Sequence, residues 1–195
     1  NMRAVRLALL TAAAFDDPAR LATAADAVSS SRPMRNAAYA LIASQLGQQA
    51  DKSHAMNFLA EASRRMTPPE PFIIAEWFRL VVSFGTPDQA GAFINGFQEP
   101  EVPLKLLSEQ YGDIIEIPDS PEHRRAELAY LIGTQMNTLR RMPEAEALYR
   151  KAMALRPDHP WNSNNLGYLL LDLGRNLDEA ATLIEAAYAQ LPHEH

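Results

Sequence analysis

A pattern of small and apolar residues occurs twice near the end of the chain and constrains the fold more than any other feature. Gly133 and Gly167 occupy equivalent positions, one repeat of about 34 residues apart. The first copy reads Ala129, Ile132, Gly133, Met136, Ala145, Tyr149, Ala152 and Pro157, and the second reads Ser163, Leu166, Gly167, Leu170, Ala180, Ile184, Ala187 and Pro192. Helical spacing on both sides of a turn predicts two helical hairpins that share one core.

This tract, residues 126–192, resembles the tetratricopeptide repeat (TPR) family, and residues 36–68 resemble it moderately. The earlier tract holds Tyr39, Ile42, Ala43, Leu46, Ala55, Leu59, Ala62 and Thr67-Pro68. The family's large aromatic residue in the first helix is replaced by Ala129 and Ser163, and the last unit carries an extra residue near Asn176. The resemblance implies an all-α fold, a right-handed α-α superhelix that forms a TPR-like solenoid of antiparallel helical hairpins.

The regularity of the pattern predicts one continuous solenoid with three parts. Residues 1–100 are expected to form divergent TPR-like hairpins. Residues 101–125 are expected to form an irregular insertion, with a short helix near 104–111 and an extended segment over 113–118. Residues 126–195 are expected to form the two regular hairpins. Four pairs each precede an apolar periodic stretch and predict helix starts: Asp17-Pro18, Thr86-Pro87, Ser120-Pro121 and His159-Pro160. Proline is tolerated in the first turn because the N–H that it lacks would have no acceptor within the helix there.

Composition narrows the classes of partner. Hydrophobic residues make up 47% of the 195 residues, the formal net charge is −6, and there is no cysteine. We therefore expect no nucleic-acid partner, no disulfide and no thiol chemistry. No apolar run reaches the 18 or more residues of a membrane helix, so we expect no membrane insertion. The compartment stays open between cytoplasm and periplasm, since Asn1 before Met2 is compatible with a missing targeting segment.

Residues that could perform catalysis do not form a recognisable set. The sequence has no phosphate-binding glycine loop, no nucleophile elbow and no HExxH pair. His54 and His123 lie near expected helix starts, and His193-Glu194-His195 is better explained as a chain end than as a metal site. We therefore expect no enzymatic activity, no cofactor and no bound metal.

The resemblance also implies a binding surface, because the first helix of each TPR hairpin lines the concave face. The residues implied to form this groove are Glu127, Tyr130, Thr134, Asn137, Trp161, Asn164, Asn165, Tyr168 and Asp172. Amide side chains both donate to and accept from a peptide backbone, and aromatic rings supply apolar contact. The alternative interpretation is that Trp161 packs under the preceding hairpin. The family's basic clamp for peptide carboxylates is not matched here, because the facing lysine and arginine are missing.

These features together favour a non-catalytic scaffold or adaptor that binds a protein or peptide partner. The alternative is an accessory TPR domain of a larger enzyme or of a secretion or assembly machine whose chemistry lies outside this chain. A helical hydrolase or transferase is a remoter alternative. We also expect self-association through the C-terminal hairpin, or a following repeat, because Leu183, Ile184, Ala187 and Leu191 would otherwise leave an apolar face without a covering helix.

Overall fold

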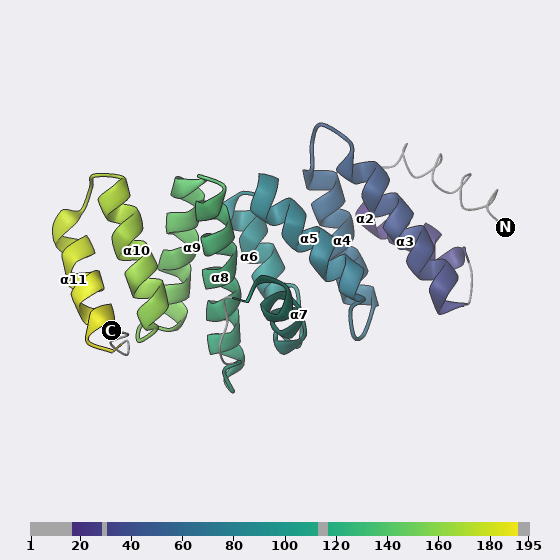
Figure 1. Cartoon of the computed structure of the whole chain (residues 1–195). Coiled ribbons are helices and arrows are strands. Elements are labelled where there is room, and N and C mark those ends of the chain that lie inside the picture. Colours follow the sequence, from purple (N-terminus) through teal and green to yellow (C-terminus); the bar gives the residue numbers. More distant parts are fainter. Residues whose placement is uncertain (1–16, 29–30, 113–116, 191–195) are drawn as a thin grey trace. The chain divides into compact units, whose positions relative to one another are not determined.

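The computed structural model describes residues 17–28, 31–112 and 117–190, and every regular element in them is a helix. The described part of the chain is therefore all-α, as the sequence predicts (Figure 1). The ten helices are α2 (Pro18–Ala27), α3 (Arg32–Gly47), α4 (Ser53–Arg65), α5 (Pro71–Phe84), α6 (Pro87–Asn95), α7 (Glu101–Tyr111), α8 (Pro121–Thr138), α9 (Met142–Leu155), α10 (Pro160–Asp172) and α11 (Leu177–Tyr188). None of these helices has the length and apolarity that a membrane crossing requires.

The prolines begin helices where the sequence predicts it. Asp17 caps α2 by accepting the backbone N–H groups of Ala19 and Arg20, and Ser120 caps α8 in the same way. At the start of α6, Thr86 accepts the N–H of Gln89 at 3.3 Å, and the Gln89 side chain accepts the N–H of Thr86 at 2.9 Å. These caps satisfy the first-turn donors that a helix cannot satisfy internally.

The described residues form two compact units. The first holds the residues up to Gly85 together with Gly96–Gln98, and the second holds Thr86–Asn95 and the residues from Glu99 onward. The three ranges that the sequence pattern suggested, 1–100, 101–125 and 126–195, describe regularity of the repeat and remain a prediction.

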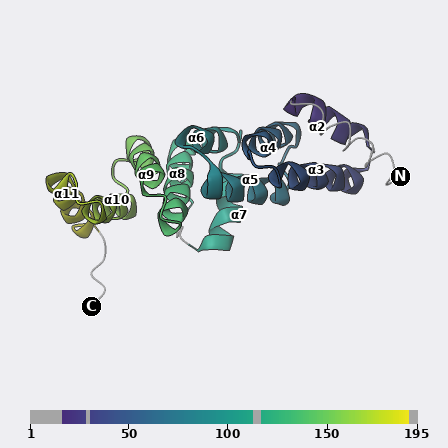
Figure 2. The same cartoon turned by 90° about the horizontal axis from the view of Figure 1, so that it is seen from above.

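The first unit packs α2, α3, α4 and α5 around aromatic side chains. The Tyr39 ring stacks on Phe58 at 5.6 Å between centroids, and Trp77 contacts Phe97 at 5.5 Å. Ala55 and Ala62 on α4 are completely buried, as expected of small residues that let helices approach. Figure 2 shows α2, α3, α4 and α5 seen from above.

The second unit contains two hairpins in which consecutive helices run in opposite directions. In Figure 1, α8 to α11 alternate up and down, and contacts join α8 to α9, α9 to α10 and α10 to α11. α6 packs against α8 and α9, and α7, which occupies the predicted short-helix segment, packs against α8. Arg124 of α8 forms an ion pair with Glu101 of α7 at 3.2 Å. Of the predicted extended segment 113–118, residues 113–116 lie outside the described residues.

The repeated glycines lie at close approaches between paired helices. A Cβ atom on Gly133 would come within 3.0 Å of the Tyr149 ring, and one on Gly167 within 2.6 Å of Ile184 Cγ1. Cβ atoms are essentially never found as close as 2.6 Å to another heavy atom, so position 167 requires glycine for this packing, whereas 3.0 Å is an unusually tight contact that leaves little room for a side chain at position 133. The predicted packing role of these two glycines is confirmed.

Candidate functional site

The candidate site lies on α8 and α10, the first helices of the two regular hairpins. Thr134 and Asn137 lie near one stripe of α8, and Trp161, Asn164, Asn165, Tyr168 and Asp172 lie near one stripe of α10, because residues three, four, seven and eleven apart share a face. All seven have exposed surface, with Trp161, Tyr168 and Asp172 the most exposed. We call these seven residues the α8/α10 face.

The two remaining residues of the predicted groove, Glu127 and Tyr130, are buried rather than exposed. Only 4% of Glu127 and 7% of Tyr130 is accessible. Both side chains point into contacts with their own chain, so their groups are not displayed on the surface as the resemblance implied. The physical reason is that α8 is enclosed by several helices along this segment, and residues 126–133 are all buried.

Glu127 contacts two side chains from the segment that connects α9 to α10. Its Oε1 accepts a hydrogen bond from Arg156 Nη1 at 2.6 Å, and its Oε2 lies 3.0 Å from His159 Nε2. His159 is also buried. A buried carboxylate is retained only when it is paired and hydrogen-bonded, and here both conditions hold. The cluster attaches α8 to the segment that leads into α10.

His159 has a second role as the N-cap of α10. Its Nδ1 accepts the backbone N–H of Asn162 at 3.1 Å, which leaves the ring proton on Nε2, facing Glu127. Asn162 is completely buried, and its amide donates to the Tyr149 carbonyl at 2.9 Å. The start of α10, which carries Trp161 and leads into Asn164, is thereby held against both α8 and α9.

Tyr130 forms the support beneath the exposed residues. Asn165 Nδ2 on α10 donates to the Tyr130 hydroxyl on α8 at 3.1 Å, so the two stripes meet through a direct hydrogen bond. The Tyr130 ring contacts Tyr149 and His159, with centroids 6.1 and 4.9 Å apart. The Tyr149 hydroxyl donates to Thr134 at 3.3 Å. Packing and hydrogen bonds thus fix the backbone under the α8/α10 face.

The outer part of the face consists of exposed side chains, several of which have no hydrogen-bond partner among the described residues. Trp161 is 44% exposed and Tyr168 is 55% exposed. Within the described residues, the side chains of Asn137, Asn164 and Asp172 form no hydrogen bond or ion pair. The face therefore presents two free amides, one free carboxylate and two large aromatic side chains. Large aromatic side chains are enriched at protein-binding surfaces.

The charged side chains that link α9 and α11 behave differently, because they satisfy one another. Arg150 donates to both carboxylate oxygens of Glu179, at 2.7 and 3.0 Å, and to Glu146 at 2.9 Å. Arg175 also binds Glu146. The hydrogen bonds from Arg150 lower the pKa of Glu179 below its ordinary value. This network connects the second helices of the two hairpins and leaves few free groups for a ligand.

The other candidates from the sequence are separate from this face. His54 lies in the first turn of α4, near Gln49, and His123 lies in the first turn of α8. No cluster of three metal-binding side chains occurs in the part of the chain that the structure describes, and His193 to His195 lie outside it. On α11, Ala187 is buried and Leu183 and Ile184 are half-buried, while Leu191 lies outside the described residues. Leu177 and Tyr188 are the large exposed apolar side chains of this helix.

Sequence reasoning missed the contribution of Arg156 and His159. One signal was present, because His159 immediately precedes Pro160 and so stands at an N-cap position. Its pairing with Glu127 carries no such signal, because the partners are 32 residues apart and on different helices.

No family model, characterised protein or solved structure matches this chain. Its function is therefore inferred from its own residues.

Proposed function

We propose that this chain is a TPR-like helical repeat protein and a non-catalytic scaffold that binds an extended polypeptide on the α8/α10 face. The single observation that carries the proposal is the exposed Trp161 and Tyr168 beside amide side chains that have no partner within the described residues. The antiparallel hairpins α8/α9 and α10/α11, with equivalent glycines at their closest approach, support the architectural part.

The chemistry of the face suits a peptide in an extended conformation. A peptide backbone alternates N–H donors and C=O acceptors, and an asparagine amide can satisfy one of each. Asn137 and Asn164 are free to do so, while Asn165 has its amide nitrogen committed to Tyr130 and its oxygen available. Trp161 and Tyr168 offer large apolar contact with few rotatable bonds to immobilise. Asp172, the one carboxylate of the face, favours a neutral or basic ligand segment.

The test is selection of peptides from a random library displayed against the immobilised chain, followed by affinity measurement on a selected peptide. Two exposed tyrosines supply a matched pair of variants. Tyr168→Ala removes a ring from the α8/α10 face, and Tyr188→Ala removes a ring from α11 that is at least as exposed. We expect Tyr168→Ala to weaken binding at least tenfold, since each 1.4 kcal/mol of binding energy is about tenfold in affinity. We expect Tyr188→Ala to bind as the wild type does.

Asn164→Ala examines the hydrogen-bonding part of the proposal. Loss of one or two amide hydrogen bonds, about 0.5–1.5 kcal/mol each, predicts a several-fold to tenfold loss of affinity. A selected peptide that binds equally well to the Tyr168→Ala, Asn164→Ala and wild-type chains would show that the α8/α10 face is not the binding surface. Failure to select any peptide that binds saturably would argue against polypeptide binding itself.

A further inference from the structure

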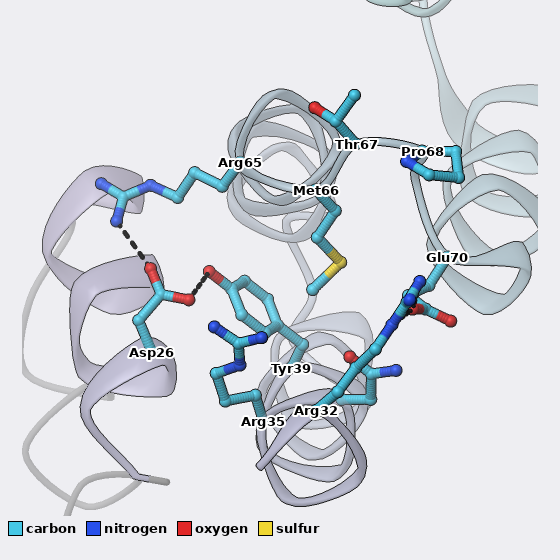
Figure 3. Close-up of a pocket in the computed structure, with 10 residues that line it drawn as sticks. Asp26, Arg32, Arg35, Tyr39, Arg65, Met66, Thr67, Pro68 and Glu70 are labelled. Atoms are coloured by element: carbon cyan, nitrogen blue, oxygen red, sulfur yellow. Dashed lines mark hydrogen bonds and ion pairs between the residues drawn. The ribbon is translucent and has the colours of Figure 1, made fainter. Parts of the chain in front are cut away.

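The first unit contains a second candidate site, which is a pocket and not an exposed face. A cavity of about 230 Å³ lies between α2, α3 and the connection from α4 to α5 (Figure 3). Its lining is rich in charge, with three arginines (Arg32, Arg35 and Arg65) and two carboxylates (Asp26 and Glu70).

Arg65 is fully engaged within the protein and forms part of the wall. It donates to Asp26 at 3.0 Å, to Glu61 at 2.7 Å, and to the Ala19 carbonyl at 3.2 Å. Asp26 also accepts the hydroxyl of Tyr39 at 3.0 Å, and Figure 3 shows both contacts of this carboxylate. Burial, and then the hydrogen bond to Asp26, raise the pKa of Tyr39 above its ordinary value, so Tyr39 stays neutral and keeps donating. This side of the pocket is a rigid, satisfied network.

Arg32 is also paired. Its Nη2 lies 2.5 Å from Glu70 Oε1, and Figure 3 shows the two groups together on the opposite side of the pocket. Glu61 lies outside the lining and is shared between Arg65 and Arg64. The pocket and its surroundings therefore hold four guanidinium groups and three carboxylates, with one positive charge left over. The guanidinium groups are those of Arg32, Arg35, Arg64 and Arg65, and the carboxylates are those of Asp26, Glu61 and Glu70.

The uncompensated charge belongs to Arg35. Among the described residues, neither Arg35 nor its neighbour Asn36 forms a side-chain hydrogen bond or an ion pair, and both are half-buried in the pocket wall. In Figure 3 the Arg35 side chain extends from α3 toward Tyr39. The pocket therefore holds a planar cation with all its donors available, beside a free amide, between two walls that are already neutralised.

We propose that this pocket binds an oxyanion, either a carboxylate or a phosphate group of a small ligand, through Arg35 with the Asn36 amide as a second donor. Guanidinium forms paired, parallel hydrogen bonds with either group, and such charge-assisted bonds are about twice as strong as neutral ones. The partial burial of Arg35 reduces competition from water. The volume suits one such group with a short substituent, which makes this site distinct from the extended α8/α10 face.

The experiment is a titration of the complete, isotopically labelled chain with inorganic phosphate and, separately, with succinate, followed by amide chemical shifts. Sodium chloride keeps the ionic strength constant, because unspecific attraction of anions is screened by salt. We expect saturable shifts at the start of α3 and in the connection from α4 to α5. Saturation by phosphate alone, by succinate alone or by both identifies the preferred oxyanion, and each of these outcomes supports the site.

The matched variants are Arg35→Gln and Arg125→Gln. Arg125 on α8 is likewise half-buried and has no partner in the described residues, so the two variants change net charge equally. We expect Arg35→Gln to weaken anion binding at least tenfold and Arg125→Gln to leave it unchanged. Arg35→Lys, which keeps the charge but loses the planar fork, should also weaken it.

Shifts that are linear in anion concentration, or that saturate equally in Arg35→Gln and wild type, would overturn the proposal. If a variant fails to fold, the positions of the shifted amides in the wild-type chain still show whether the anion binds in this pocket. Saturable shifts confined to another region would show that Arg35 is an ordinary surface cation.

Discussion

Replacement of Gly167 by alanine isolates the effect of close helix packing from the effect of helix propensity. In the middle of a helix, alanine is favoured over glycine by about 0.5–1 kcal/mol. At position 167, however, the added Cβ would lie 2.6 Å from Ile184 Cγ1 and 3.0 Å from the Ala180 carbonyl oxygen. One of these atoms belongs to the backbone of α11, so relief requires that helix to move away from α10.

The expected change in the free energy of unfolding is the cost of overpacking minus the gain in helix propensity. Overpacking of a well-packed interior costs about 1–3 kcal/mol. Contacts this short with a backbone atom favour the upper half of that range, and subtraction of the propensity gain predicts a net loss of about 1–2 kcal/mol for Gly167→Ala. Gly167→Leu should cost 3 kcal/mol or more by the same reasoning, since its remaining atoms have no space beside α11.

Gly91→Ala supplies the matched control. Gly91 is also buried within a helix, but its added Cβ would meet only Lys151 Nζ, the flexible end of a long side chain, at 3.1 Å. We expect this variant to be as stable as the wild type or up to about 1 kcal/mol more stable.

Urea denaturation followed by far-UV circular dichroism measures both variants. With a slope of about 1–3 kcal/mol per molar urea, the midpoint of Gly167→Ala should fall by about 0.3–2 M, and that of Gly91→Ala should stay unchanged or rise by up to about 1 M. Shifts of the same sign and size in Gly167→Ala and Gly91→Ala would refute the conclusion that Gly167 is required by contact with α11.

Four further replacements test other parts of the structure. Glu127→Leu should lower the free energy of unfolding by about 3 kcal/mol, because it leaves the buried His159 and the half-buried Arg156 without a carboxylate; an unchanged melting temperature would contradict this. Hydrogen bonds from Arg65 and Arg64 lower the pKa of Glu61 below its ordinary value. Its contribution to stability is therefore complete above the ordinary pKa of a glutamate and is lost as the pH falls through the lowered value. Glu61→Gln should accordingly show a shallower loss of stability in acid than the wild type, and parallel curves would disprove the assignment. Acrylamide should quench Trp161, 44% exposed, far more than Trp77, 1% exposed, so Trp161→Phe should remove most of the quenchable fluorescence. Light scattering should give a mass that rises with concentration if the C-terminal hairpin self-associates, and Tyr188→Lys should reduce that rise.

The positions of helices could be predicted from local features of the chain. Proline after a capping residue marked the starts of α2, α6, α8 and α10, because both effects act within one turn and need no other helix. The repeated glycines and alanines likewise indicated where helices approach closely. These signals are properties of neighbouring residues and of the period at which they recur.

The accessibility of particular side chains could not be predicted in the same way. Glu127 and Tyr130 lie on the stripe of α8 that the repeat pattern assigned to a ligand face, yet both are buried. The arginine and histidine that meet Glu127 come from the end of α9 and the start of α10. Periodicity tells which residues share a helix face, but which element covers that face depends on helix packing.

The sequence by itself determined an all-helical chain, the helix boundaries at the prolines and the glycines at the close approaches. Only the tertiary structure decided which polar groups are satisfied. The buried Glu127 is neutralised by Arg156, Asn164 is left free, and Arg35 faces a pocket while Arg65, one helix away, is fully paired. The physical reason is that helix formation depends on neighbours within a few residues, whereas the pairing of a charge depends on atoms that packing brings from distant parts of the chain.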